Sequence, residues 1–280
     1  MALTPLQRRI CRLLAEQRRQ GGESYVAGGT ALNELLGGAR RSRDVDLFHD
    51  TEQALAVTWQ RDRDALSTAG LLVTVSREGP SFVQATVGDE RGAEVLQWVQ
   101  DSAFRFFPLL EDEAFGLTLH PLDHATNKLL AVAGRRTARD WIDAIQCLER
   151  VQPLGYLAWA ASGKDPGLSP SYIVEQAART RWTQGEVDQL DFEGPAPSAA
   201  ALSTRWHQAI DEAREIIRLL PSQQAGACVL DDRGGLQRAS PAELPAELAA
   251  GRVSFHEGRI RGAFPEMRTR DGAVPARRPT

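Results

Sequence analysis

The chain has 280 residues, of which 42% are hydrophobic and 25% are charged, and its formal net charge is -4. This is the composition of an ordinary soluble globular protein with enough length for one large or two smaller domains. No apolar run approaches the roughly 20 residues of a membrane helix, and the first residues lack the basic-then-apolar order of a signal peptide. We therefore expect neither a membrane protein, nor a secreted disulfide scaffold, nor a disordered chain, but a cytoplasmic protein.

Charge and cysteine spacing restrict the function only a little further. The acidic balance gives no global electrostatic reason to expect a nucleic-acid coat. The cysteines, Cys11, Cys147 and Cys228, are widely separated and show no metal-ligand spacing, as is typical of reduced residues. Lys128 and Lys164 are the only lysines. A lysine kept at a site is therefore expected to serve as a compact ammonium donor.

Helical and strand patterns alternate along the first 150 residues. A helix is predicted over 4–19, because Thr4 can cap it and Pro5 suits its first turn. Apolar spacing then predicts strands over 25–27, 45–48, 71–75, 82–87 and 94–99. Further helices are expected over 31–36, 51–68, 121–133 and 137–150. This order predicts an α/β (α+β) unit with a small mixed sheet and helices packed on it.

The pattern changes after Pro153. Helices are predicted over 169–181 and 201–220, and short strands over 229–230 and 253–255. From about residue 268 the sequence is polar and basic, which is typical of a disordered tail. The sequence therefore predicts a first domain over 1–152, a mainly helical C-terminal region over 153–267 and a disordered tail over 268–280.

Two short motifs in the first domain carry the chemistry, Gly28-Gly29-Thr30 and Ser42-x-Asp44-Val45-Asp46. A Gly-Gly turn ahead of a helix lets backbone N–H groups approach a phosphate. Asp44 and Asp46 alternate along a predicted strand, so both carboxylates point to the same face. Two carboxylates on one face are natural ligands of Mg²⁺, and phosphoryl or nucleotidyl transfer requires metal and phosphates at neighbouring strand ends.

Each motif alone also has an ordinary structural explanation. Gly-Gly-Thr is most often a turn, and Asp-Val-Asp is most often a solvated strand face. Both motifs occur here in this order, about fifteen residues apart and between two predicted strands, which favours a functional site.

Three blocks of the sequence resemble a known family. Gly28–Leu32 and Arg41–Phe48 look like the signature of the abortive-infection nucleotidyltransferase toxins. These are the AbiEii/AbiGii-type and MenT-like proteins of the DNA polymerase β superfamily. The third block is similar too, with Asn127-Lys128-Leu129-Leu130-Ala131, then Arg135 and Arg139-Asp140-x-x-Asp143. The resemblance covers roughly residues 20 to 150 and implies a polymerase-β-like nucleotidyltransferase core.

The resemblance also implies a division of roles. Gly28, Gly29 and Thr30 would hold the triphosphate, with Ser42 near the phosphates, and Asp44 and Asp46 would bind one Mg²⁺ or a metal pair. Lys128 would neutralise phosphate charge, and Asp140 would orient it or help to activate the acceptor hydroxyl. Arg135 lies seven residues after Lys128 on one predicted helix, hence on the same face, and would complete the nucleotide site.

The third acidic position of the fold is in question. Many polymerase-β-like enzymes place a third carboxylate on a later strand, and the candidate strand here sets the uncharged Gln97 at that position. Glu94 is expected on the opposite face, and Asp101 lies past the strand end. The site then works with two carboxylates, or Glu94 or Asp101 serves through a bulge, or catalysis is weakened. His49, next to the acidic strand, is a further candidate to line the site.

The first functional hypothesis is an Mg²⁺-dependent nucleotidyltransferase that moves a nucleoside monophosphate from an NTP to an acceptor hydroxyl. By resemblance the acceptor is a tRNA 3′ end, the protein is a toxin with a cognate antitoxin, and no membrane is involved. The alternatives are a non-catalytic nucleotide-binding regulatory module and a transferase that acts on a small molecule. Arginines on the C-terminal helices form either a basic wall for RNA or salt bridges with neighbouring acids, and the second is favoured.

Overall fold

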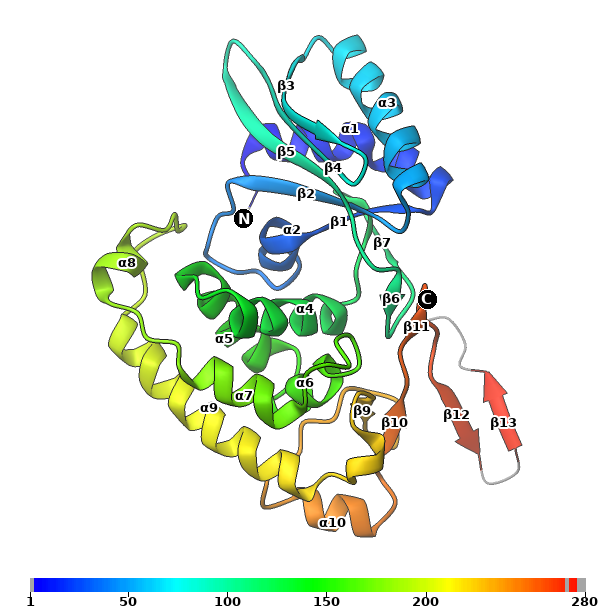
Figure 1. The fold of residues 1–280 in the computed structure, drawn as a ribbon, viewed down its shortest axis with the longest axis vertical. Helices are drawn as coiled ribbons and strands as arrows, with labels where there is room; N and C mark the ends of the chain where they lie inside the picture. The colour runs from blue at the N-terminus through cyan, green and yellow to red at the C-terminus, as the bar shows by residue number, and fades with distance from the viewer. Residues whose placement is uncertain (1–2, 270–271, 276–280) are drawn as a thin grey trace. The chain divides into compact units, whose positions relative to one another are not determined.

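The computed structural model describes residues 3–269 and 272–275, and the chain divides into two compact units (Figure 1). The first unit contains the residues up to Ala103, Leu109–His124 and Asp188–Ala196. The second contains Phe104–Pro108, Ala125–Val187 and the residues from Pro197 onward. The chain therefore returns to the first unit twice after leaving it.

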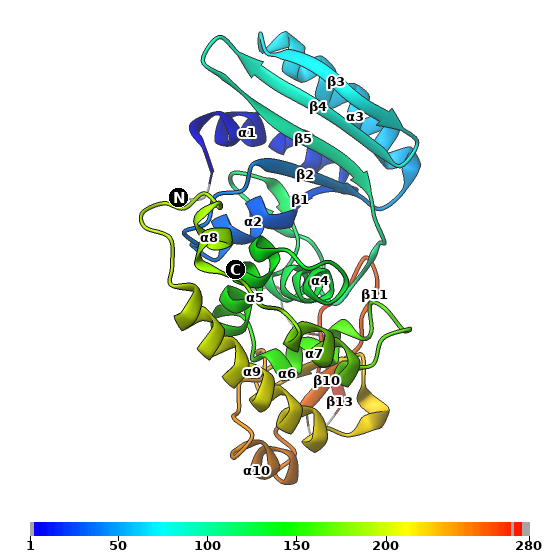
Figure 2. The same ribbon diagram turned by 60° about the vertical axis from the view of Figure 1, so that its left-hand side comes forward.

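The first unit is built on a seven-stranded mixed sheet of order β3-β4-β5-β2-β1-β8-β7 (Figure 2). β2 is parallel to β5 and β1 is parallel to β8, whereas the other neighbours are antiparallel. The small mixed sheet predicted from the sequence is thereby confirmed. Its elements are α1 (Pro5–Gly21), β1 (Ser24–Ala27), α2 (Gly28–Leu35), β2 (Asp44–His49), α3 (Glu52–Thr68), β3 (Leu72–Gly79), β4 (Phe82–Asp89), β5 (Gly92–Gln100), β7 (Leu110–Asp112) and β8 (Gly116–Thr118).

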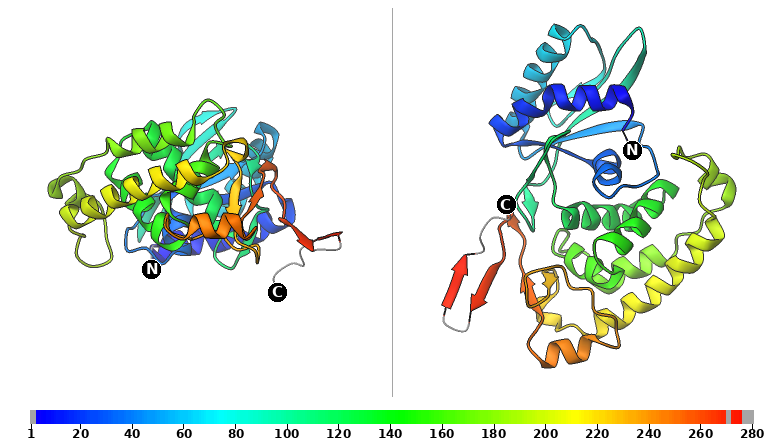
Figure 3. Two further views of the ribbon diagram at one scale, coloured as in Figure 1. Left: turned by 90° about the horizontal axis from the view of Figure 1, so that it is seen from below. Right: turned by 180° about the vertical axis from the view of Figure 1, so that it is seen from behind.

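One face of this sheet packs against α1 and α3 and forms the core of the unit (Figure 3). Val45 and Leu47 of β2 and Leu96 and Trp98 of β5 point to it, and each is at most 1% exposed. Because side chains alternate along a strand, the intervening residues of β2 and β5 point to the other face. In β2 the acids Asp44 and Asp46 therefore lie on the face opposite the core residues Val45 and Leu47.

The predicted first helix has the expected start. The Thr4 side chain accepts a hydrogen bond from the backbone N of Gln7, and the Gln7 side chain accepts one from the Thr4 backbone N, which makes a capping box. Gly22 ends the helix with a φ of 68°, a left-handed conformation that favours glycine.

The second unit is mainly helical, and three of the helices that the structure describes are absent from the sequence prediction: α6 (Leu154–Ala161), α8 (Gln184–Asp188) and α10 (Leu244–Ala249). α6 is buried at every position, so it shows no amphipathic stripe by which a helix is recognised. The helices are α4 (Pro121–Gly134, which starts in the first unit), α5 (Ala138–Arg150), α6 (Leu154–Ala161), α7 (Pro170–Ala178), α8 (Gln184–Asp188), α9 (Ala199–Leu219) and α10 (Leu244–Ala249), with a 3-10 turn at Ser222–Gln224. The strands are β6 (Phe104–Arg105), β9 (Cys228–Leu230), β10 (Ser254–His256), β11 (Arg259–Ile260), β12 (Glu266–Thr269) and β13 (Gly272–Pro275).

The predicted domain boundary at residue 152 is a different division from these compact units, which place α5 in the second unit, and it stays a prediction. Of the tail predicted to be disordered, residues 270–271 and 276–280 lie outside the described residues. Within the same tail, β12 pairs with β13 in an antiparallel hairpin. Across the part of the chain that the structure describes, no helix combines the length and the apolar character needed to cross a bilayer.

Candidate active site

Gly28 joins β1 directly to α2 and brings the backbone against a carboxylate. Its φ is 72°, which side chains rarely adopt. A Cβ at this position would lie 2.0 Å from Oδ2 of Asp46, far inside van der Waals contact. Position 28 therefore requires glycine twice over, once for its conformation and once for its space. The predicted Gly-Gly turn lies beside the predicted carboxylates.

Asp44 and Asp46 are half-buried on the face of β2 that points away from α1 and α3, as the alternation predicts. Both residues thus present carboxylate oxygens to one side of a rigid central strand. Oxygen donors of this kind suit Mg²⁺, which is commonly bound by one or two carboxylates together with substrate phosphates. The donor set fits the implied metal.

Thr30 is fully buried, and its hydroxyl donates a hydrogen bond of 2.5 Å to the backbone carbonyl of Asp44. Nδ2 of Asn33 donates to the carbonyl of Gly29 over 2.8 Å, so the first turn of α2 is also held from inside. The Thr30 proton is therefore committed to the protein itself. Thr30 thus attaches α2 to the start of β2. The sequence resemblance implied a different role for Thr30, direct binding of the triphosphate.

Ser42 lies in the loop between α2 and β2 and is half-buried. Its backbone carbonyl accepts a hydrogen bond of 3.0 Å from Nε2 of Gln7 in α1. The loop that carries Ser42 is thus attached to the N-terminal helix two residues before Asp44.

The register of β5 shows where the candidates for a third carboxylate lie within this unit. Gln97 is the partner of Asp46 across the parallel β2–β5 pair and shares its face of the sheet. Glu94 points to the helix-covered face, where its carboxylate accepts hydrogen bonds from Thr4 (2.6 Å) and Gln7 (3.0 Å). Asp101 is exposed, four residues beyond Gln97, which is about 13 Å along a strand. Neither candidate acid stands beside Asp46. Among the described residues, no group of three or more His, Cys, Asp or Glu side chains could hold a metal ion.

His49 does not line this face, contrary to the expectation from its place in the sequence. It occupies the third inward position of β2, is fully buried, and its Nδ1 lies 3.3 Å from the carbonyl of Val99. Burial lowers its pKa to about 4, so the ring is neutral at physiological pH.

Lys128, Arg135 and Asp140 form a second cluster, in the second unit. Nζ of Lys128 lies 2.9 Å from Oδ1 of Asp140 and 3.2 Å from Oδ2 of Asp143. Arg135 Nε lies 2.9 Å from the other oxygen of Asp140, which also accepts a hydrogen bond of 2.6 Å from the Thr137 hydroxyl. Two cations and two buried carboxylates thus balance in charge.

Burial alone raises the pKa of Asp140, but Lys128 and the hydrogen bonds from Thr137, Lys128 and Arg135 outweigh it and bring the pKa to about 2. A carboxylate so firmly ionised is a poor acceptor for a proton from a hydroxyl. Of the two predicted roles for Asp140, the geometry therefore favours the orientation of Lys128.

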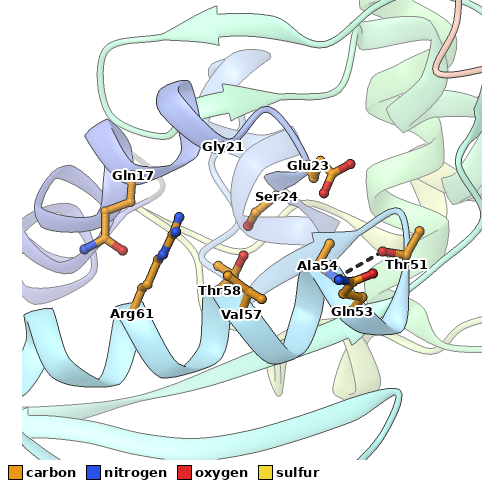
Figure 4. Close-up of a pocket in the computed structure, with 10 residues that line it drawn as sticks. All are labelled: Gln17, Gly21, Glu23, Ser24, Thr51, Gln53, Ala54, Val57, Thr58 and Arg61. Atoms are coloured by element: carbon orange, nitrogen blue, oxygen red, sulfur yellow. Dashed lines mark hydrogen bonds between the residues drawn. The ribbon is translucent and has the colours of Figure 1, made fainter.

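A pocket of about 370 Å³ lies on the helix-covered face of the sheet (Figure 4). Gln17 of α1, Ser24 of β1 and Thr58 and Arg61 of α3 are among the residues in its wall. Ser24 is the strand partner of His49, so both point to the face opposite Asp44 and Asp46. This pocket is therefore separate from the carboxylates.

Several arginines of the C-terminal helices pair with acids, the arrangement that the sequence favoured. Arg205 pairs with Glu149, Arg214 with both Glu175 and Asp211, and Arg218 with Glu215.

Comparisons with known proteins concern the fold. No protein-family model matches the chain, and no curated protein matches it significantly. Among solved structures, the nucleotidyltransferase toxin MenT4 from Mycobacterium tuberculosis aligns over 88% of this chain and 92% of its own, with a TM-score of 0.51 and 16% identity.

Two further structures align at lower scores. A candidate nucleotidyltransferase from H. pylori covers 78% of this chain and 99% of its own at a TM-score of 0.48 and 14% identity. The polyadenylate synthase of Megavirus covers 52% of this chain and 31% of its own at 0.39 and 15%. The likeness to MenT4 spans nearly the whole chain and confirms the fold that the sequence resemblance implies. This chain has the fold of a MenT-like nucleotidyltransferase.

Proposed function

We propose that this protein is an Mg²⁺-dependent nucleotidyltransferase that transfers a nucleoside monophosphate from an NTP to an acceptor hydroxyl. The observation that carries the proposal is the approach of Gly28 to Asp46, where a Cβ would lie 2.0 Å from the carboxylate. A backbone turn and two strand carboxylates meet there at the start of a helix, in a fold shared with a nucleotidyltransferase toxin. Nucleotidyl transfer needs phosphate contacts and metal ligands side by side.

In this reaction the acceptor oxygen bonds to the α-phosphorus, and the bond from that phosphorus to the β-bridging oxygen breaks. Pyrophosphate leaves with the electron pair, and the acceptor proton passes to solvent or a nearby base. Mg²⁺, when bound, neutralises phosphate charge and orients the reacting groups. The chain's own part is positional: Asp44 and Asp46 hold the metal, while Gly28 and Gly29 present backbone to the phosphates.

Lys128 supplies a compact cation for phosphate charge in this proposal, and Asp140 orients it, with Arg135 beside them. The ion pair of 2.9 Å between Lys128 and Asp140 supports the orienting role. Asp143, at 3.2 Å from the same ammonium, restricts it further. Ser42 serves near the phosphates from the loop before β2.

We further propose that the acceptor is the 3′ end of a tRNA, that transfer to it arrests growth, and that a cognate antitoxin restrains the enzyme. The support is the sequence resemblance to AbiEii/AbiGii-type and MenT-like toxins and the description of the MenT4 structure as a toxin. An intracellular target of this kind agrees with a cytoplasmic location.

The test is transfer of label from each α-³²P-NTP, with Mg²⁺, to a small-RNA pool and to a total-protein pool. Wild type is compared with Asp44→Asn, which keeps the size of the side chain and removes its charge. Label that enters RNA with a preferred NTP and disappears in Asp44→Asn establishes reaction, nucleotide and acceptor class together. Label that enters protein keeps the reaction and overturns the tRNA acceptor.

A second candidate function follows from Gln97, which stands beside Asp46 where a third acid would strengthen metal binding. A protein that binds NTP without turnover needs the glycine turn but not a full set of acids. Tight Mg²⁺–NTP binding by calorimetry, with no label in RNA, protein or a small-molecule extract, would establish this regulatory module and overturn catalysis. Label in the small-molecule extract alone identifies a transferase of the antibiotic-modifying kind.

A further inference from the structure

A short segment from the C-terminal half of the chain pairs with the loop that leads into the acidic strand. The backbone N of Arg41 donates to the carbonyl of Asp191 over 2.9 Å, and the N of Glu193 donates to the carbonyl of Ala39 over 2.7 Å. Arg40 and Phe192, between these two bonds, form an antiparallel bridge. Residues 191–193, called here the strap, therefore act as an added strand on the α2–β2 loop.

The strap belongs to the first compact unit, although the residues on either side of Asp188–Ala196 belong to the second. No sequence pattern marks it, because it has neither helical nor strand periodicity. It contacts the loop three residues before Asp44, and the Gln7 side chain contacts the same loop at Ser42. The loop is thus held from two sides, by the strap and by α1.

This attachment matters because the loop itself supplies little order. It contains Gly37 and Gly38 and then three arginines within four residues, and it makes no regular element before β2 begins. An unpaired loop of this composition would sample many conformations, and Ser42 would move with it. Backbone hydrogen bonds at Ala39 and Arg41 leave Ser42 only one residue away from a fixed point.

We infer that the strap is a positioning element for nucleotide binding. The backbone hydrogen bonds of Asp191 and Glu193 hold the α2–β2 loop, so that Ser42 and Asp44 are already in place when the NTP binds. This inference rests on the proposed nucleotidyl transfer. It assigns to residues 191–193 a part in substrate binding that neither the motifs nor the domain boundaries of the sequence indicate.

Glu193→Pro is the sharpest test, because proline removes the N–H that bonds to Ala39. Proline also requires an extended residue before it, and Phe192 already stands in a strand-like bridge. Glu193→Ala is the matched control, since it removes the same side chain and keeps the N–H.

Two readouts separate loop order from catalysis. Trypsin cuts after the loop arginines, and mass analysis of the first fragments gives the initial rate of cleavage after Arg41 and Arg43. We expect Glu193→Pro to raise that rate and the KM for NTP by roughly fivefold or more, the usual weight of one hydrogen bond, with a smaller change in kcat. Glu193→Ala should change both quantities less than Glu193→Pro does, because it keeps the N–H.

Equal trypsin rates and equal KM values in the proline and alanine variants would overturn the inference. If Glu193→Pro does not fold, Phe192→Gly is used in its place, because it loosens the strap while keeping both hydrogen-bond donors. The trypsin rate and the KM of Phe192→Gly are then compared with those of Glu193→Ala, and equal values would again overturn the inference. If no NTP turnover exists in wild type, the proposed function fails, whereas faster trypsin cleavage in Glu193→Pro still shows that the strap orders the loop.

Discussion

The two clusters of predicted site residues are built by different physical means. The carboxylate cluster of the first unit depends on backbone: a glycine of φ 72° against Asp46, strand alternation, and a threonine bonded to the Asp44 carbonyl. The Lys128–Asp140 cluster of the second unit depends on buried charges that balance one another. Substitutions in the carboxylate cluster should therefore change ligand geometry more than stability. Substitutions in the Lys128–Asp140 cluster should change stability more than ligand geometry.

The largest expected effect is on stability, in Lys128→Met. Removal of the ammonium leaves the buried carboxylates of Asp140 and Asp143 without their shared cation, and loss of one partner of a buried pair costs about 3–5 kcal/mol. Urea unfolding followed by circular dichroism measures this change.

Lys164→Met is the comparison variant, because the only other lysine hydrogen-bonds to the neutral Asn127 at 2.8 Å and lies 5.8 Å from the centroid of the Phe106 ring. Asn127 and Phe106 are neutral and carry no charge that the substitution would leave behind, so this variant should lose less stability than Lys128→Met. Equal losses in the two variants would show that the Lys128 cluster is no more important to the fold than the contacts of the half-buried Lys164.

Gly28→Ala should give the largest loss of activity at moderate cost in stability. A methyl group 2.0 Å from Oδ2 of Asp46 has to displace the carboxylate, and misplacement of a reacting group by about 1 Å costs about 100-fold in rate. Gly22→Ala is the matched control, with a φ of 68° but nothing within 4 Å of the added Cβ. Both variants bear the strain of about 1–2 kcal/mol for a left-handed residue. If both also lose the same activity, backbone strain and not the clash with Asp46 is the cause.

Acid should weaken the second cluster within a defined pH window. The pKa of Asp140 is lowered from 3.8 to about 2 in the folded protein, so the folded state holds the ionised form more tightly than the unfolded chain does. This contribution, on the order of 2 kcal/mol, is complete above about pH 4 and is lost as the pH falls through 2. The stability difference between wild type and Asp140→Asn should shrink across that window. A gap that stays constant from pH 4 to 2 would contradict the assignment.

Local pattern was enough to predict the elements that hold the carboxylates. The alternation in β2 places Asp44 and Asp46 on one face, and the family resemblance set Gln97 where a third acid commonly lies, a position that the register brings beside Asp46. These predictions succeed because the side chains of a half-buried strand alternate between apolar and polar in the sequence. α6 shows no periodic pattern of apolar and polar residues, since its eight residues are all buried. β8 has only three residues and pairs with β1 far back in the chain.

The contacts that the sequence did not reveal are those between distant segments. The strap meets the α2–β2 loop across some 150 residues, and Glu94 meets Thr4 across 90. The family resemblance implied that Thr30 is a triphosphate ligand. Its burial depends on how α2 packs on β2, which periodicity does not encode.

Thr30→Val is expected to give the smallest effect on activity of these variants. It distinguishes two roles for Thr30, the positioning of Asp44 and the direct binding of the triphosphate. The substitution keeps the shape and removes the hydroxyl that donates to the Asp44 carbonyl, so a buried acceptor loses its partner at about 1–2 kcal/mol. If Thr30 positions Asp44, kcat should fall by roughly tenfold with KM nearly unchanged, because the misplaced carboxylate acts in the transition state. If Thr30 instead binds the triphosphate directly, KM should rise while kcat is retained. Thr30→Ser keeps the hydroxyl and should behave as wild type in either case, so a loss in Thr30→Ser equal to that in Thr30→Val would show that the methyl group, and not the hydrogen bond, matters at this position.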